Sequence, residues 1–144
     1  MLSETPSIEQ LTQVITSVTA PAFLLGAVAG FISVLVSRLN RVLDRSQALN
    51  SIEDDDRSRA RLKADIPRLK RRAVLLSNAV LFATICAIIT ALLIIVAFAT
   101  AFFRLQHEYG IAVLFIIALA FFIVSVVNLA REARIGLHEF DHYK

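Results

Sequence analysis

Residues 73–103 read AVLLSNAVLFATICAIITALLIIVAFATAFF, a run of 31 residues without a charged side chain. About 20 apolar residues are enough for a helix to cross the hydrocarbon core of a bilayer, which is about 30 Å thick. A helix over the whole run would be about 46 Å long at 1.5 Å per residue, so it must tilt or project beyond the membrane. The run therefore predicts a transmembrane helix.

Two further charge-free runs flank this one, at 10–37 and at 109–130, and the apolar part of the first begins at Val18. The chain is 57% hydrophobic, whereas a soluble domain is usually about 45–50% apolar. We therefore expect an all-α membrane protein that forms a single domain over 1–144. Its three transmembrane helices are predicted at 18–37, 73–103 and 110–130.

Lysine and arginine are distributed unevenly around these runs. Eleven of the 15 basic residues lie in 38–72, none precedes the first run, and one lies between the second and third runs. Cytoplasmic loops of membrane proteins carry the excess of Lys and Arg. We therefore expect 1–17 to be an outer amphipathic segment, 38–72 to be cytoplasmic, and 131–144 to form a cytoplasmic tail.

The segment before the first run has its own helix signal. Ser7 and Gln10 have the spacing of a capping box, in which two side chains satisfy free backbone N–H groups at a helix start. Apolar residues follow at helical spacing, at Ile8, Leu11, Ile15 and Val18. These features predict a short amphipathic helix on the outer surface, leading to a bend near Pro21.

The basic segment 38–72 is predicted to be helical rather than a flexible linker, because it lacks glycine and contains one proline. Apolar residues recur at helical spacing on both sides of it, at Leu35, Leu39, Val42 and Leu49 and again at Leu62, Ile66 and Leu69. Residues 50–56 are the predicted turn, and Pro67 should kink or restart the returning helix. The first and second helices would then extend into a cytoplasmic helical hairpin.

Small and polar residues share one face of the first span. At 100° per residue they fall within an arc of about 80°; they are Thr19, Ala22, Gly26, Gly30, Ser33, Ser37 and Asn40. The second span has a similar series at Ala79, Ala83, Ala87, Thr90, Ala97 and Ala101. One interpretation is close helix packing. The other is a water-filled path in an oligomer, with its cytoplasmic mouth at Arg38, Arg41, Asp44 and Arg45.

Amide and hydroxyl side chains recur near the predicted inner ends of the spans. Besides Ser37 and Asn40, they are Ser77, Asn78, Ser125 and Asn128. We expect these to form hydrogen bonds between helices. No Asp, Glu, Lys, Arg or His lies in the centre of a span, so the usual marker of a proton relay or a coupled transporter is missing.

Other signals for chemistry are weak. The sequence HEFDH at 138–142 fits the H-E-x-x-H zinc pattern, but it ends two residues before the last residue and leaves no room for a third ligand. The acidic run at 53–56 lacks the glycine of a calcium loop and reads as a solvated turn. We therefore expect no catalytic residue, no metal site and no cofactor, and we expect that the protein is not an enzyme.

Three stretches resemble a known family. They are VTAPAFLLGAVAGFISVLVSRLNRVLDRS at 18–46, RLKRRAVLLSNA at 68–79 and VNLAREARI at 127–135. Together they resemble the uncharacterised bacterial three-span membrane proteins called domain of unknown function 2721. The resemblance implies a protein of the bacterial inner membrane and supplies no catalytic residues.

Two functions remain open from the sequence. The first is a homo-oligomeric, channel-like membrane protein that conducts ions, with the first helix lining the path. The second is a non-conducting scaffold or regulator, whose basic hairpin docks a cytoplasmic partner or anionic lipid headgroups. Nucleic acid is not an expected partner, because only the net charge of +3 favours it.

Overall fold

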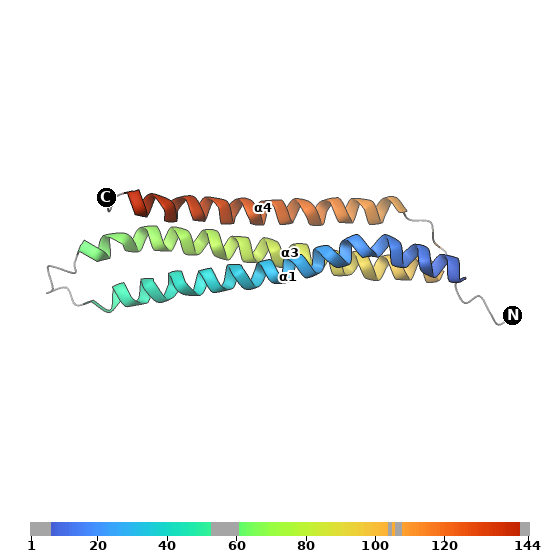
Figure 1. Cartoon of the computed structure of the whole chain (residues 1–144), viewed down its shortest axis with the longest axis horizontal. Coiled ribbons are helices and arrows are strands. Elements are labelled where there is room, and N and C mark those ends of the chain that lie inside the picture. Colours follow the sequence, from blue (N-terminus) through green and yellow to red (C-terminus); the bar gives the residue numbers. More distant parts are fainter. Residues whose placement is uncertain (1–6, 53–60, 104, 106–107, 142–144) are drawn as a thin grey trace.

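The computed structural model describes residues 7–52, 61–103, 105 and 108–141. Its elements in chain order are helix α1 (Ile8–Asn50), the 3-10 helix η1 (Arg61–Asp65), α3 (Ile66–Phe103) and α4 (Glu108–Asp141). The three α-helices run alongside one another, and each is long and apolar enough to cross a membrane (Figure 1). This confirms the predicted all-α fold with three membrane-spanning helices.

Helix α3 is the centre of the bundle. It contacts both α1 and α4 along much of its length, whereas α1 and α4 barely touch each other. Helix α1 begins at one end of the bundle, and α4 ends at the opposite end, where α1 also ends (Figure 1). The chain therefore crosses the length of the bundle three times.

Helix α1 starts as the sequence predicts. The Ser7 hydroxyl accepts a hydrogen bond from the Gln10 backbone N–H at 3.3 Å, and the Gln10 side-chain oxygen accepts one from the Ser7 N–H at 3.1 Å. The predicted short helix before Pro21 is not an element of its own, however, because α1 is one helix that continues through Pro21. An internal proline removes one backbone hydrogen bond and bends a helix without having to end it. Figure 1 shows α1 changing direction in its blue N-terminal part.

The helices α1 and α3 extend well past the charge-free runs. Helix α3 has 38 residues and is about 57 Å long, against a hydrocarbon core of about 30 Å. Pro67 is the second residue of α3 and follows the change from 3-10 to α-helix, so it restarts the helix as predicted. The predicted acidic turn at 53–56 lies outside the described residues.

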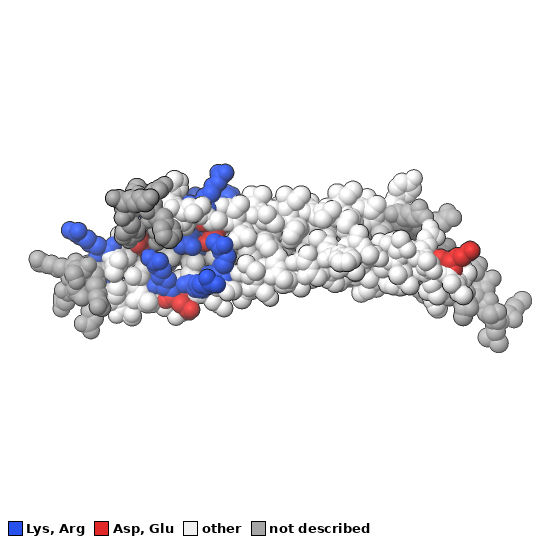
Figure 2. Space-filling view, viewed as in Figure 1, with Lys and Arg blue, Asp and Glu red and all other residues white. Residues whose placement is uncertain are grey.

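Charged side chains gather at one end of the bundle. In Figure 2 the Lys and Arg side chains cluster where α1 ends and α3 begins, and the long middle of the visible face is uncharged. This division agrees with an apolar section inside a bilayer and a charged section outside it.

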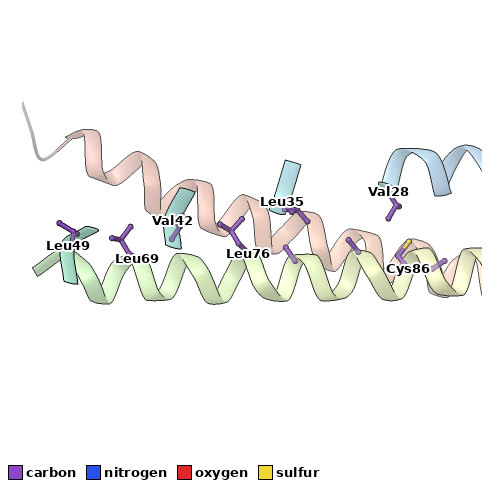
Figure 3. Close-up of a cluster of buried hydrophobic side chains, with 10 residues drawn as sticks. Val28, Leu35, Val42, Leu49, Leu69, Leu76 and Cys86 are labelled. Atoms are coloured by element: carbon purple, nitrogen blue, oxygen red, sulfur yellow. The ribbon is translucent and has the colours of Figure 1, made fainter. Parts of the chain in front are cut away.

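The buried residues of the bundle repeat every seven positions. In α1 they include Pro21, Val28, Leu35, Val42 and Leu49. In α3 they fall into two such series, Leu69, Leu76, Ala83, Thr90 and Ala97, and Ala79, Cys86 and Leu93. A seven-residue repeat keeps one seam of a helix facing its partner through a slight left-handed supercoil. Figure 3 shows part of this set, in which Val28, Leu35, Val42 and Leu49 of α1 form one buried cluster with Leu69, Leu76 and Cys86 of α3.

Candidate functional site

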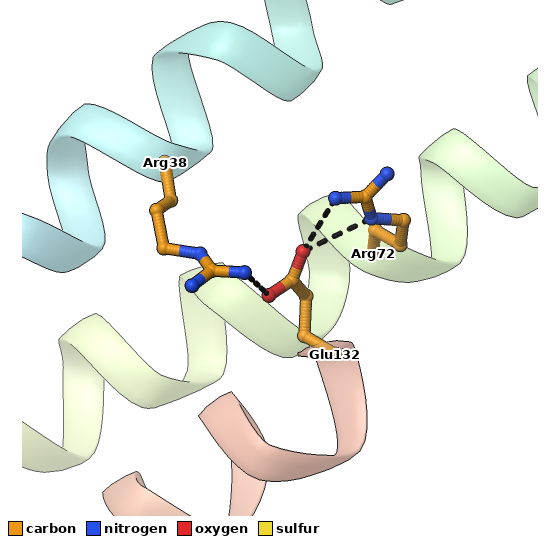
Figure 4. Close-up of polar contacts among 3 residues, drawn as sticks. All are labelled: Arg38, Arg72 and Glu132. Atoms are coloured by element: carbon orange, nitrogen blue, oxygen red, sulfur yellow. Dashed lines mark hydrogen bonds and ion pairs between the residues drawn. The ribbon is translucent and has the colours of Figure 1, made fainter. Parts of the chain in front are cut away.

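Three charged side chains from three different helices meet inside the bundle (Figure 4). Glu132 of α4 lies between Arg72 of α3 and Arg38 of α1. Arg72 donates two hydrogen bonds to Glu132 Oε1, from Nε at 3.0 Å and from Nη2 at 2.9 Å. Nη2 of Arg38 lies 3.0 Å from Glu132 Oε2. We call these three residues the ion triad.

The position of the ion triad follows from the ends of the apolar runs. Arg38 follows the first run directly, Arg72 immediately precedes the second, and Glu132 comes two residues after the third. The three helices lie alongside one another, so these ends come to the same level. Glu132 also continues a seven-residue series of buried positions in α4, after Ala118 and Ser125. The helix therefore directs the carboxylate into the bundle.

Burial differs sharply among the three members of the ion triad. The side chain of Glu132 is 0% exposed, that of Arg72 is 17% exposed, and that of Arg38 is 38% exposed. A buried carboxylate must be paired, because its desolvation costs several kcal/mol or more. Oε1 is satisfied by Arg72, but Oε2 is buried and has no hydrogen bond within the described part of the chain. The Arg38 contact is thus an ion pair without hydrogen-bond geometry.

Gly136 makes room for the Arg72 guanidinium. A Cβ atom at Gly136 would lie 3.3 Å from Arg72 Nη2 and 3.5 Å from Cζ. Gly136 is one turn beyond Glu132 on α4, so the guanidinium rests on the helix backbone while it binds the carboxylate. A larger side chain here would have to displace Arg72.

The predicted pore-lining or packing residues of α1 lie on the outside of the bundle. All seven residues, which we call the small-residue face, are exposed: Thr19, Ala22, Gly26, Gly30, Ser33, Ser37 and Asn40. No atom outside the local helix backbone lies within 4 Å of a Cβ placed at Gly26 or Gly30. Within a single chain this face packs against no other described helix.

The comparison with protein families shows which family the chain belongs to. The family model described as "protein of unknown function (DUF2721)" matches residues 18–142. The chain belongs to this family. The predicted resemblance is therefore confirmed, and the match includes all of the ion triad and the small-residue face. No curated protein and no solved structure matches this DUF2721 protein.

The predicted cytoplasmic mouth divides into two parts in this DUF2721 protein. Arg38 belongs to the ion triad, whereas Arg41, Asp44 and Arg45 are exposed on the extension of α1. Arg38 is therefore oriented by Glu132, and the other three face the surroundings of the bundle.

The four polar residues predicted to join helices have different surroundings. The Ser125 hydroxyl is buried and donates a 2.6 Å hydrogen bond to the Ala79 carbonyl, which joins α4 to α3. The Asn128 amide donates instead to the Val124 carbonyl of its own helix at 2.9 Å. Ser77 and Asn78 are exposed. Within the described residues, Ser125 is the one member of this set that bonds across helices.

The described part of the DUF2721 chain contains no cluster of three or more His, Cys, Asp or Glu side chains that could hold a metal ion. His138 is exposed near the end of α4. The side chains of the other residues in the HEFDH motif lie outside the described residues.

Sequence reasoning missed Arg72 and Glu132 as parts of a site. Their positions at the ends of charge-free runs made them look like ordinary interfacial charges. The available signal was the seven-residue spacing of Ala118, Ser125 and Glu132, which would have placed the carboxylate on the buried side of its helix.

Proposed function

We propose that this protein is a homo-oligomeric, channel-like membrane protein in which α1 of each copy lines a path for ions. The observation that carries the proposal is the exposure of the small-residue face along α1. The proposed membrane is the bacterial inner membrane, with α1 beginning outside and α4 ending in the cytoplasm. The proposed partners are further copies of this chain and the surrounding lipid.

The chemistry of the small-residue face supports a wet or helix-packed environment rather than lipid. The Thr19 hydroxyl donates a hydrogen bond to the Ile15 carbonyl of its own helix at 2.8 Å. The side chains of Ser33, Ser37 and Asn40 make no hydrogen bond within the described part of the chain. Polar groups without partners are costly in hydrocarbon, so these three favour contact with water or with another copy.

Self-association is the step that would create a path. In one chain α1 and α4 each pack against α3 and barely touch each other, so the three described helices do not form a closed ring. Glycine and serine at the surface let helix backbones approach closely, and this stabilises helix association where lipid supplies no hydrophobic driving force. In a ring of copies, Arg41 and Asp44 would set the charge at the cytoplasmic mouth.

The test combines subunit counting with ion flux. The full chain is placed in lipid nanodiscs and its copies are counted by mass; it is then reconstituted in liposomes for flux measurements. We expect a ring of four or more copies and measurable flux, and loss of flux in Gly30→Leu and Ser33→Leu. Thr84→Leu, on an exposed position of α3, is the matched control and should keep both properties.

A monomer or dimer in nanodiscs would overturn the proposed path. Flux equal to that of empty liposomes for every tested ion would do the same.

A scaffold or regulator is the second candidate, and the cluster of basic side chains at one end of the bundle favours it (Figure 2). In that case a cytoplasmic protein or anionic lipid would bind the hairpin. Charge reversal at Arg57, Arg59 and Arg61 would then abolish partner binding, while Gly30→Leu would leave it unchanged. The channel proposal predicts the opposite result for ion flux, which Gly30→Leu would abolish and the charge reversals would leave unchanged.

A further inference from the structure

Arg38 has unused capacity to donate hydrogen bonds. A guanidinium carries five N–H donors in a planar fork. Arg38 approaches Glu132 Oε2 at 3.0 Å without forming a hydrogen bond, and it has no other acceptor within the described residues. Its side chain is 38% exposed. The donors of Arg38 are therefore accessible from outside the bundle.

Arg38 also brings positive charge to the surface of the ion triad. Two guanidinium groups share one carboxylate, and Arg72 already gives that carboxylate two hydrogen bonds. Glu132 is fully buried, so an anion that approaches from outside meets Arg38 before the carboxylate. The guanidinium of Arg38 is thus available to a second anion.

The depth of Arg38 identifies the kind of anion. Arg38 directly follows the apolar part of α1, at the level where headgroups border the hydrocarbon core. Arg41 is exposed and lies about 60° around the helix from Arg38. Val34, one turn deeper and about 40° away on the same side, is 53% exposed. Two cationic side chains therefore lie above an apolar surface that suits an acyl chain.

We propose that Arg38 and Arg41 bind the phosphate group of an anionic phospholipid, whose acyl chain lies along α1 beside Val34. Arginine donates bidentate, charge-assisted hydrogen bonds to phosphate oxygens, which satisfies the donors that Glu132 leaves unused. The apolar surface below the two arginines favours a lipid over free phosphate. This site does not depend on the proposed ion path, since it needs one copy of the chain.

The test is native mass spectrometry of the delipidated full chain in mild detergent. Phosphatidylglycerol and phosphatidylcholine with the same acyl chains are titrated separately, and inorganic phosphate is added as a competitor. We expect tighter binding of phosphatidylglycerol, weakened about fivefold by R38Q and about fivefold by R41Q. R68Q is the control, because it removes the same charge at an exposed position one turn beyond Arg72; it should change binding by less than about twofold.

The R41Q variant tests the lipid site without disturbing the contacts that hold the helices together, because Arg41 lies outside the ion triad. Circular dichroism and gel filtration confirm that each variant is folded before the lipid titration. An equal loss of phosphatidylglycerol binding in R68Q would overturn the site, because it would mean attraction to the basic surface as a whole. Unchanged binding in R41Q would overturn it too. Displacement of phosphatidylglycerol by millimolar inorganic phosphate would overturn the assignment to lipid.

Discussion

Glu132 is the residue that ties α1 to α4 at the charged end of the bundle. These two helices otherwise touch little, although the rings of Phe31 and Phe122 make an edge-to-face contact with their centroids 5.4 Å apart. A carboxylate that binds two arginines therefore fixes the relative position of all three helices. Removing Glu132 is therefore costly, because it takes away the carboxylate that Arg38 and Arg72 both face and leaves the two cations close together.

Glu132→Gln should lower the free energy of unfolding by about 3 kcal/mol, the low end for breaking a buried ion pair, because Arg38 is partly hydrated. Cys86 is fully buried and is the single cysteine of the chain, so its reaction with a thiol-specific fluorescent dye reports thermal unfolding. Asp44→Asn, which removes an exposed carboxylate, is the control and should change stability by less than about 0.5 kcal/mol. Equal unfolding temperatures for the two variants would contradict the role given to Glu132.

Gly136 is the second residue with a specific steric role, because Arg72 rests against it. Gly136→Leu should destabilise the chain by about 1–3 kcal/mol, the usual cost of overpacking, by moving Arg72 away from Glu132. Gly110→Leu is the matched control, since nothing lies within 4 Å of a Cβ at that position. The same dye assay on Cys86 compares the two. If both substitutions had the same effect, helix propensity rather than the contact with Arg72 would be responsible.

At the scale of elements, the contact between α1 and α3 depends on the seven-residue repeat. Leu76 is 0% exposed within this contact, whereas Leu81 on the same helix is 55% exposed. Leu76→Ala should cost about 2 kcal/mol of stability, the low end for such cavities, because lipid adds little hydrophobic transfer energy to packing. Leu81→Ala should cost less than about 0.5 kcal/mol. Guanidinium or detergent titration of both variants measures the difference, and equal midpoints would contradict the repeat as the packing seam.

The sequence predicted the three spans, the cap at Ser7 and the restart at Pro67, because these depend on local composition and backbone chemistry. It did not predict which faces pack. In lipid both faces of a helix are apolar, so the contrast that marks a buried face in a soluble protein is missing. Small residues indicate where another helix can approach closely, but they do not identify that helix. Ala83 of α3 is buried within the bundle, whereas Gly30 of α1 is exposed.

Glu132 could not be placed from local sequence for a related reason. A charge just beyond an apolar run is usually a solvated interfacial residue. The register of α4 against α3 turns this carboxylate inward, and within α4 that register is visible in the seven-residue spacing of Ala118, Ser125 and Glu132. The buried contact of Ser125 with the Ala79 carbonyl lies on the same side of α4 and shows the same register.

At the scale of the whole molecule, the bundle is asymmetric along its length. Basic side chains gather where α1 ends and α3 begins (Figure 2), and α1 begins at the other end (Figure 1). In a membrane the basic end should face the cytoplasm, because Lys and Arg in short loops are retained on that side during insertion. The two ends of α1 should therefore lie on opposite sides of the membrane.

Cysteine labelling in intact bacterial cells tests this orientation. In a Cys86→Ala background, Glu9→Cys and Ser51→Cys place single thiols at exposed positions near the two ends of α1. A membrane-impermeant maleimide should label the first in intact cells and the second only after the membrane is permeabilised. The unsubstituted chain, whose Cys86 is buried midway along α3, should resist labelling in both conditions. Labelling of Ser51→Cys in intact cells would reverse the orientation, and it would then place the ion triad at the outer leaflet.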